Sequence, residues 1–243
     1  MSASDNSPGL DGVTPAEKGR KTNDQAIYDN IYEAVLTQRL PPGSRLPEVA
    51  LSELYGVSRS IIRKALTRLA SDHVIEQKPN QMAMVPKPSV SDTRQIFAAR
   101  RLVEGEEMRV TAGQLDPSQL KDLRSLVQQE KAAHDSHRDQ DRVHCSMAIH
   151  RFVAAHCPNR VLGEMMRELV LRTSIVIGLY KSSGITACFL GDDHARLADL
   201  LASGDGDAAS TLVHEHLCTL ENLLDLDDRA PEIDLASILK PQG

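Results

Sequence analysis

The chain has 243 residues, which is long enough for two domains that each bury a hydrophobic core. Only 3% of the residues are aromatic and none is tryptophan, so aliphatic residues must build the cores, as is typical of helical bundles. No apolar run approaches the roughly 20 residues that a membrane helix needs, which argues against an integral membrane protein. Four widely spaced cysteines without a signal peptide indicate a reducing compartment, so we expect a cytoplasmic protein.

The net charge of -6 is divided unevenly along the chain. Residues 20–88 carry ten Lys and Arg against seven Asp and Glu, a balance of +3, whereas residues 89–243 carry -7. A mildly basic first part joined to an acidic second part is the pattern expected of a protein that places its N-terminal part on DNA.

The first residues are predicted to have no fixed structure. Residues 1–22 are rich in Ser, Gly, Asp and Pro and show no apolar periodicity, which predicts a disordered tail. Asn23 or Asp24 can cap an amphipathic helix over residues 26–40. The Pro-Pro-Gly sequence at residues 41–43 then predicts a turn.

A helix-turn-helix is predicted next. Its first helix covers residues 49–55, with Leu51 and Leu54 on the apolar side, and Gly56 ends it at a tight turn. Ser58 can cap a second helix with two distinct faces. The inward face holds Ile61, Ile62, Ala65, Leu66 and Leu69, and the outward face holds Arg59, Ser60, Arg63, Lys64 and Thr67. Such arginines can bind guanine edges or phosphates in the major groove, although basic residues on a helix often only face solvent.

Two short segments, residues 74–77 and 82–85, follow this helix. Their spacing predicts a two-stranded wing, so residues 23–85 would form a winged helix-turn-helix with three helices and two strands. Pro86 and Pro88 restrict the backbone that comes next, and residues 86–91 are predicted to be a linker between two domains.

Residues 31–79 resemble the DNA-binding domain of the GntR family of bacterial transcription regulators. The family's PPGSRL turn stands at residues 41–46, and its GVSR-x-x-x-R-x-A-L-x-x-L core stands at residues 56–69. The family's wing often reads PNRGA, whereas residues 79–83 read PNQMA, so both the arginine and the glycine are missing. The resemblance implies that Arg59 and Arg63 contact DNA. It also implies three residues that bind phosphates, Arg45, Ser58 and Ser60.

Residues 92–227 are predicted to be helical, and residues 228–243 are predicted to be a loose tail. Ser91 is expected to cap the first helix, with Ile96, Ala99, Leu102, Val103 and Met108 facing inward. Because all six predicted helices are amphipathic and aromatic residues are scarce, we expect an antiparallel bundle. The predicted helices cover residues 92–113, 117–134, 142–156, 159–180, 191–203 and 207–226.

Three histidines lie on or beside the apolar stripes of different predicted helices, namely His150, His194 and His216. A single inward histidine is more often a hydrogen-bonded core residue than a ligand. Three of them in one bundle favour a shared site, because imidazoles that converge in a pocket of low dielectric suit zinc or a similar divalent ion. His144 and His214 are predicted to face solvent.

Residues 92–226 resemble the all-helical FCD domain, the ligand-sensing domain of the FadR branch of the GntR family. The three histidines match this domain's F-H…N, H…G-D and H-hydrophobic patterns. Metal-binding members have an Asp four residues before the first histidine, where this chain has Ser146, a chemically weak fourth ligand. The resemblance leaves two alternatives. The histidines could hold zinc, nickel or manganese with water or an effector carboxylate, or they could bind an acidic effector directly.

The R-x-x-x-E pattern of this domain stands at Arg100 and Glu104. In relatives an arginine at this place can face the cavity and pair with a carboxylate effector, which a planar guanidinium does well. The alternative is an ion pair between Arg100 and Glu104 on the surface of their helix.

Together these features predict a transcription regulator that is not an enzyme. We expect a homodimeric repressor at a palindromic operator on double-stranded DNA. A small carboxylate-type effector would bind at Arg100, His150, His194 and His216, reorder the bundle and change DNA affinity. Two other classes stay open, a metal-dependent hydrolytic enzyme, since three histidines with an open position can activate water, and a nonspecific architectural DNA-binding protein.

Overall fold

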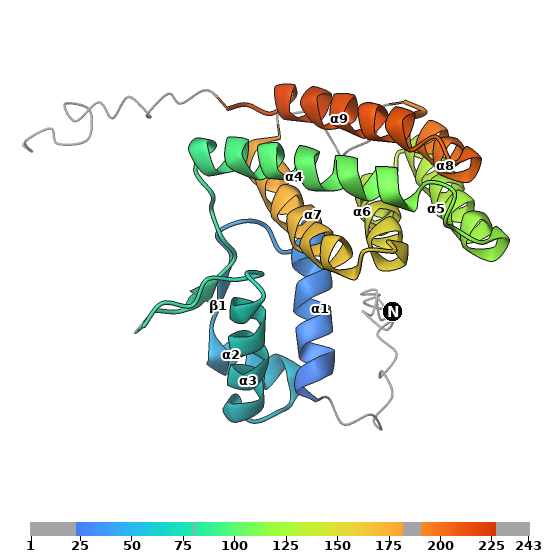
Figure 1. Cartoon of the computed structure of the whole chain (residues 1–243). Coiled ribbons are helices and arrows are strands. Elements are labelled where there is room, and N and C mark those ends of the chain that lie inside the picture. Colours follow the sequence, from blue (N-terminus) through green and yellow to red (C-terminus); the bar gives the residue numbers. More distant parts are fainter. Residues whose placement is uncertain (1–22, 80, 182–190, 227–243) are drawn as a thin grey trace, which may run out of the picture.

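A computed structural model describes residues 23–79, 81–181 and 191–226, and helices dominate this part of the chain (Figure 1). Three helices and a small sheet form the N-terminal head, residues 23–85, and six helices form the bundle, residues 90–226. The predicted fold class is therefore confirmed. The tails predicted at residues 1–22 and 228–243 lie outside the described residues. Among the described helices, none has the length and apolar character needed to cross a membrane.

The helices of the head are α1 (Asp24–Leu36), α2 (Glu48–Tyr55) and α3 (Arg59–Ser71). Asn23 caps α1, because its side-chain oxygen accepts from the amide of Ala26 at 2.9 Å. Gly56 ends α2 in the left-handed conformation (φ 63°), which glycine adopts without strain. Ser58 precedes α3 as predicted, but its hydroxyl lies 2.8 Å from that of Ser60 and makes no hydrogen bond to the helix backbone.

The head contains a two-stranded antiparallel sheet whose pairing differs from the expected one. β2 (Ala83–Met84) forms where a wing strand was predicted, but it pairs with β1 (Arg45–Leu46), which precedes α2. The segment predicted as the first wing strand contributes a single bridge, from Glu76 to Met84. Backbone groups of successive residues point to opposite sides of a strand. Met84 therefore bonds to Glu76 on one side, while Val85 bonds to Ser44 on the other.

The bundle follows the predicted helices closely. The helices are α4 (Val90–Thr111), α5 (Pro117–Asp135), α6 (Asp139–His156), α7 (Arg160–Tyr180), α8 (Asp193–Ser203) and α9 (Gly206–Asn222). α4 packs along α9 and α7, and α6 packs against α5 and α7. Asp116 caps α5 with Pro117 as its first residue, and Gly204 (φ 82°) ends α8 before the turn into α9.

Helix α4 differs from the prediction at its start and in the face it buries. Its cap is Ser89, whose hydroxyl accepts from the amide of Asp92, while the Asp92 carboxylate accepts from the amide of Ser89, each at 3.1 Å. Such a reciprocal cap needs a suitable side chain three residues later, and Ser91 has an arginine there. The helix therefore begins inside the segment predicted as a linker. Leu102, predicted to face inward, is 77% exposed, because the buried face of α4 runs through Arg100 and Glu104, and Leu102 lies on the opposite side of the helix.

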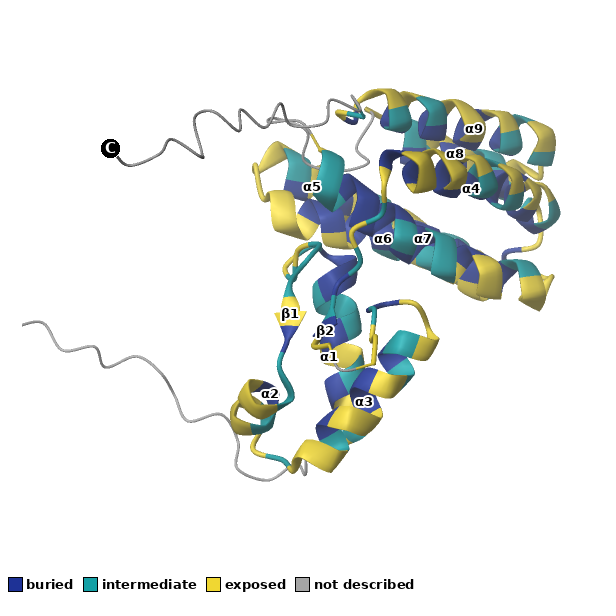
Figure 2. Cartoon of the chain, turned by 90° about the vertical axis from the view of Figure 1, so that its left-hand side faces the viewer, coloured by how far each residue is buried: buried dark blue, intermediate teal, exposed yellow. Residues whose placement is uncertain are grey.

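The head joins the bundle at the C-terminal end of α1, which is buried against α7 (Figure 2). The Ser174 hydroxyl of α7 donates to the Leu36 carbonyl at 2.5 Å, and the Gln38 amide donates to the Ser174 carbonyl at 3.3 Å. The Tyr180 hydroxyl donates to the Pro88 carbonyl at 2.7 Å and holds the connecting segment. The outer face of α2 and the start of α3 are exposed and lie away from the bundle (Figures 1 and 2).

Candidate metal centre and DNA interface

Three helices bring the predicted histidines together inside the bundle. His150 comes from α6, His194 from α8 and His216 from α9, and all three are buried. Their ring centroids are 5.0, 5.1 and 6.1 Å apart. One ring nitrogen of each lies within 4.8 Å of the others. The fold thus forms one cluster from residues that are far apart in the sequence.

A carboxylate contacts each imidazole at Nδ1. The pairs are His150 with Glu104 of α4 at 2.6 Å, His194 with Glu130 of α5 at 2.7 Å, and His216 with Asp193 of α8 at 3.2 Å. An ionised carboxylate can only accept, so Nδ1 carries the proton and the lone pair of Nε2 is left for a ligand. All three Nε2 atoms are buried and have no hydrogen-bond partner among the described residues.

Burial favours the neutral form of His150 and of His216. It lowers the pKa of His150 to about 3, and it lowers the pKa of His216 even though the hydrogen bond to Asp193 acts in the opposite direction. Burial alone raises the pKa of Glu104, but Arg100 and His150 outweigh this effect and hold that pKa well below its usual range. Neutral imidazoles backed by ionised carboxylates are a donor set that zinc takes in proteins.

The geometry of the cluster fits one divalent ion. Tetrahedral zinc with nitrogen ligands at about 2.05 Å holds those nitrogens about 3.4 Å apart, so side-chain shifts of about 1 Å would be sufficient. The cavity between the histidines has a volume of about 10 Å³, room for one water-sized species, and its walls are completed by Asp193, Leu197, Leu212 and Val213. An organic effector does not fit this space unless the bundle rearranges.

Ser146 lies one turn before His150 on α6 and is completely buried. Its hydroxyl has no hydrogen-bond partner in the described part of the chain, and it does not line the histidine cavity. A neutral hydroxyl is not one of the ligand groups that zinc prefers, unlike the carboxylate of Asp. The chain therefore offers three nitrogen ligands and leaves the other coordination positions to water or an added ligand.

Arg100 lies inside the bundle. Its Nε donates to Glu104 at 2.7 Å and both side chains are fully buried, so the predicted pair exists but is not a surface ion pair. Arg100 does not line the histidine cavity. Arg100, Glu104, Glu107 and Thr111 form a buried polar stripe at helical spacing along α4. Burial and the nearby charge of Glu104 raise the pKa of Glu107 to about 9, so this carboxyl is protonated at neutral pH.

The orienting carboxylates were not predicted as part of the site. Glu104 and Glu130 lie 46 and 64 residues from the histidines they contact, on other helices, so helical spacing around each histidine does not reveal them. A signal was available in Glu130, because a carboxylate on a buried helix face needs a partner. All three carboxylates contact their histidines at Nδ1, which suits orientation of the rings, and Asp193 also lines the cavity between the histidines.

The predicted DNA-contacting residues are all exposed on the head. They are Arg45 on β1 and Ser58, Arg59, Ser60 and Arg63 at the start of α3. The side chains of Arg59 and Arg63 are 60% and 59% exposed, and they pair with Glu48 at 3.2 and 2.8 Å. Glu48, at the start of α2, therefore holds both guanidinium groups on one face of the head.

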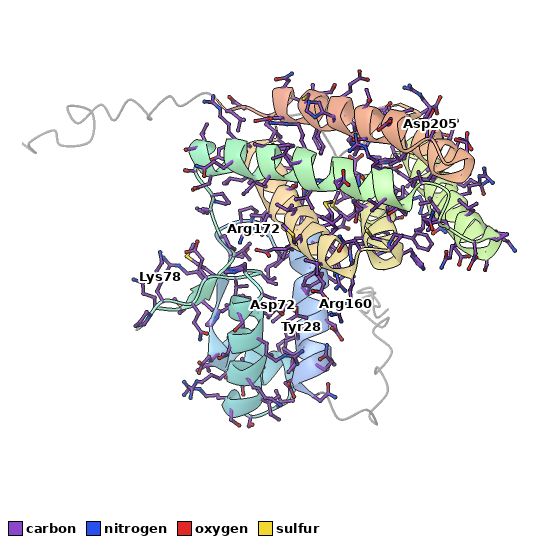
Figure 3. All side chains as sticks on the ribbon, in the orientation of Figure 1. Tyr28, Asp72, Lys78, Arg160, Arg172 and Asp205 are labelled. Atoms are coloured by element: carbon purple, nitrogen blue, oxygen red, sulfur yellow. The ribbon has the colours of Figure 1, made fainter. Side chains whose placement is uncertain are left out.

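A groove runs between the start of α3 and the wing. Arg59, Arg63, Lys78 and Gln81 line it. Lys78 projects from the wing (Figure 3), and its ammonium lies 3.4 Å from Glu76. Lys78 was not predicted to contact DNA, although an exposed lysine in a predicted turn was visible in the sequence. It supplies a cation where the wing has Gln81 in place of the family's arginine.

Comparison with protein families and solved structures agrees with this architecture. Residues 23–85 match the bacterial regulatory proteins of the gntR family, and residues 95–219 match the FCD domain. The structure of Escherichia coli McbR/YncC is similar with a TM-score of 0.71 and 20% identity, over 81% of this chain and 93% of that chain. A putative GntR regulator from Rhodococcus sp. RHA1 gives a TM-score of 0.69 and 20% identity, over 82% and 95%. These likenesses establish a shared fold.

Curated relatives are transcriptional regulators. LutR of Bacillus subtilis is 24% identical over 208 residues, which cover 76% of this chain and 93% of LutR. The transcriptional repressor RspR of E. coli is 22% identical over 193 residues, covering 79% and 85%. Matches to YdhC of B. subtilis and to a Streptomyces ambofaciens regulator span only 64% and 49% of those proteins. The chain therefore belongs to the GntR family of bacterial regulatory proteins and combines its DNA-binding domain with an FCD domain.

Proposed function

We propose that this DNA-binding regulator is a homodimeric repressor of the FadR branch, whose affinity for a palindromic operator is set by a small organic acid and a divalent metal ion. The observation that carries the proposal is the cluster of three buried histidines. One ring nitrogen of each lies within 4.8 Å of the others, and none of the three Nε2 atoms has a hydrogen-bond partner among the described residues. Residues 23–85 would bind DNA, residues 86–91 would link the domains, and residues 92–227 would bind the effector and dimerise.

The metal centre would be formed by His150, His194 and His216, with zinc, nickel or manganese as candidates and Ser146 as at most a weak fourth ligand. When bound, the ion supplies a Lewis acid that a carboxylate effector can coordinate. The carboxylates behind the histidines keep the Nδ1 protons in place and fix the ring orientations. Arg100 compensates the charge of Glu104 and could turn to an acidic effector when the bundle rearranges.

The DNA-reading function would lie at the start of α3. Arg59 and Arg63 would reach base edges in the major groove, while Arg45, Ser58 and Ser60 would bind phosphates. In the free protein Glu48 occupies both guanidinium groups. DNA binding would replace this carboxylate with guanine or phosphate acceptors, so Glu48 would compete with DNA for both arginines.

The metal centre is tested by metal analysis of untagged protein purified without chelator. We expect close to one equivalent of metal per chain in the wild type and none in the His194→Ala, His216→Ala double variant. His214→Ala is the matched control, because His214 is exposed on the same helix as His216 and should leave the metal content unchanged. Failure of the wild type to bind zinc, nickel or manganese even after loading would overturn the metal centre.

Specific binding of a dimer to a palindromic operator is tested by selecting duplexes from a random DNA library with the purified full chain. A palindromic consensus bound by a dimer, with binding lost in Arg63→Ala, would support it. Binding that is independent of sequence would instead favour the architectural alternative. Candidate organic acids can then be screened on the selected duplex, where release of DNA identifies an effector and the sign of its action.

A further inference from the structure

Helix α6 carries a histidine of the candidate centre and a contact to the head at consecutive positions. His150 is completely buried beside His194, whereas Arg151 reaches α1. Consecutive residues of a helix point about 100° apart. One rigid helix therefore faces the histidine cluster on one side and the DNA-binding head on another.

Arg151 contacts two neighbouring residues of α1. Its Nη1 donates to Glu33 Oε2 at 3.2 Å, and its guanidinium lies 5.5 Å from the centre of the Tyr32 ring. His144, two turns earlier on α6, places Nδ1 2.9 Å from the other Glu33 oxygen. We call these four residues, Tyr32, Glu33, His144 and Arg151, the α1–α6 latch.

Helix α1 is bonded in turn to the DNA-reading helix. Asp24, at the start of α1, accepts from Lys64 and Arg68 of α3, each at 3.2 Å. The Tyr28 hydroxyl donates to Asp72, just after α3, at 2.6 Å, and the two residues lie together in Figure 3. The helices also pack along each other. Ion pairs, a hydrogen bond and packing thus tie α1 to α3.

The C-terminal end of α1 has a separate attachment. The hydrogen bond from Ser174 to the Leu36 carbonyl ties it to α7, is buried, and does not involve α6. The latch is more exposed, with 38% of the Arg151 side chain and 29% of the Glu33 side chain accessible to solvent. Exposed ion pairs contribute little stability. The Ser174 contact can thus serve as a fixed point while the latch turns α1 about it.

We propose that the α1–α6 latch transmits occupancy of the histidine centre to the DNA-reading helix. This inference rests on the proposed metal site. An ion that draws the three Nε2 atoms together shifts His150 relative to α8 and α9, and α6 takes Arg151 with it. Glu33 and Tyr32 follow, and α3 changes its position through its bonds to α1.

Hydrogen exchange of the full chain with and without zinc chloride tests the latch on peptides from α1 and α3. In the wild type we expect zinc to change exchange in these peptides by roughly fivefold or more, the lower end of typical coupling between sites. Glu33→Gln and Arg151→Gln should each reduce the change to less than about twofold, as expected when one link of a coupled pair is removed. Zinc affinity, measured by competition with a chromophoric chelator, should stay close to that of the wild type.

Arg160→Gln is the matched control for the latch substitutions. Arg160 forms an exposed ion pair with Glu164 within α7, so its replacement makes the same chemical change at a place outside the latch. This variant should keep the full zinc response in α1 and α3. A reduced response in Arg160→Gln would mean that any lost charge weakens coupling, and this would overturn the specific role of Arg151.

The outcomes separate the latch from the metal site. Zinc binding with an unchanged response of α1 in both latch variants, or with no response in the wild type, would overturn the latch and leave the metal site standing. No zinc binding in the wild type would overturn the proposed function itself. If a single substitution unfolds the head, the reversed pair Glu33→Arg with Arg151→Glu decides, because a true latch recovers the response and any other role does not.

Discussion

Two arginine–glutamate pairs in this chain have similar distances and opposite surroundings. In the head, Arg63 donates to Glu48 at 2.8 Å, and the two side chains are 59% and 22% exposed. In the bundle, Arg100 donates to Glu104 at 2.7 Å, and both side chains are fully buried. Water and salt screen the exposed pair, whereas the buried charges have no solvent to replace a lost partner.

The difference in burial shows that an arginine–glutamate ion pair can be either exchangeable or fixed. The Arg63–Glu48 pair can open at little expense in free energy, so its arginine is available to DNA. The Arg100–Glu104 pair is fixed, and Glu104 uses its other oxygen to orient His150 at 2.6 Å. The exposed ion pair lies where we propose that DNA binds, and the buried ion pair lies where it can hold the ring of His150 in place.

The largest expected effect is a loss of stability when the carboxylate charge of the buried pair is removed, compared with the same change at the exposed pair. Glu104→Gln should lower the free energy of unfolding by about 3–5 kcal/mol, because it removes one charge of a fully buried ion pair with Arg100. Glu48→Gln should leave that free energy nearly unchanged. Urea denaturation followed by circular dichroism measures both. Equal effects of the two substitutions would show that burial does not distinguish the pairs.

A second effect concerns pH and the buried acid next to this pair. In the folded chain the pKa of Glu107 is raised from its ordinary value of 4.5 to about 9. Between pH 4.5 and pH 9 the folded state therefore holds a proton that the unfolded state has lost. Stability should therefore fall as pH rises through this window, by up to about 1.4 kcal/mol per pH unit. Urea denaturation between pH 7 and pH 9 should show that the free energy of unfolding depends less on pH in Glu107→Gln than in the wild type. Glu106→Gln, an exposed neighbour, should behave as the wild type.

A smaller effect is expected behind the histidines. Glu130→Gln keeps the shape of the side chain but weakens its hold on His194 Nδ1, so zinc affinity should fall about 10- to 100-fold. Competition with a chromophoric chelator measures the affinity. Glu215→Gln, exposed beside His216, is the control and should bind zinc as the wild type does. Unchanged affinity in Glu130→Gln would mean that the carboxylate does not orient the ligand.

The smallest effect is expected on DNA. Glu48→Gln removes the carboxylate that competes for Arg59 and Arg63, and it removes a negative charge from the interface. Affinity for the selected duplex should rise about two- to fivefold, the range expected for an exposed ion pair. Fluorescence anisotropy at several salt concentrations measures this change. Weaker binding in Glu48→Gln would show instead that Glu48 positions the arginines and that its loss outweighs the relief of competition.

Helical periodicity predicted most of this fold and the residues of the buried histidine cluster. The stripes that placed His150, His194 and His216 inward are local patterns, and local patterns survive folding when the opposite face meets water. The same reasoning predicted that Leu102 of α4 faces the core, and this prediction is wrong because Leu102 is exposed. That helix buries a polar stripe containing Arg100 and Glu104, and polar residues inside a bundle become visible only when their partners are known.

The features that sequence did not predict are contacts between distant segments. Glu130 reaches His194 from another helix, and β2 takes β1 as its partner instead of the nearer segment at residues 74–77. In both cases the choice depends on which elements the tertiary fold brings together. Ser89 is different, because its capping box with Asp92 was readable from the spacing alone.

The cavity between the histidines, at about 10 Å³, is too small for an organic acid to enter without a rearrangement of the bundle. If the effector of the proposed function is an organic acid that binds at this cavity, it can enter only after the bundle opens. Its association rate would then level off at the rate of opening, however much effector is present. Openings of this kind take microseconds to seconds. The regulator would therefore ignore pulses of effector that are shorter than the opening time and respond to effectors that persist.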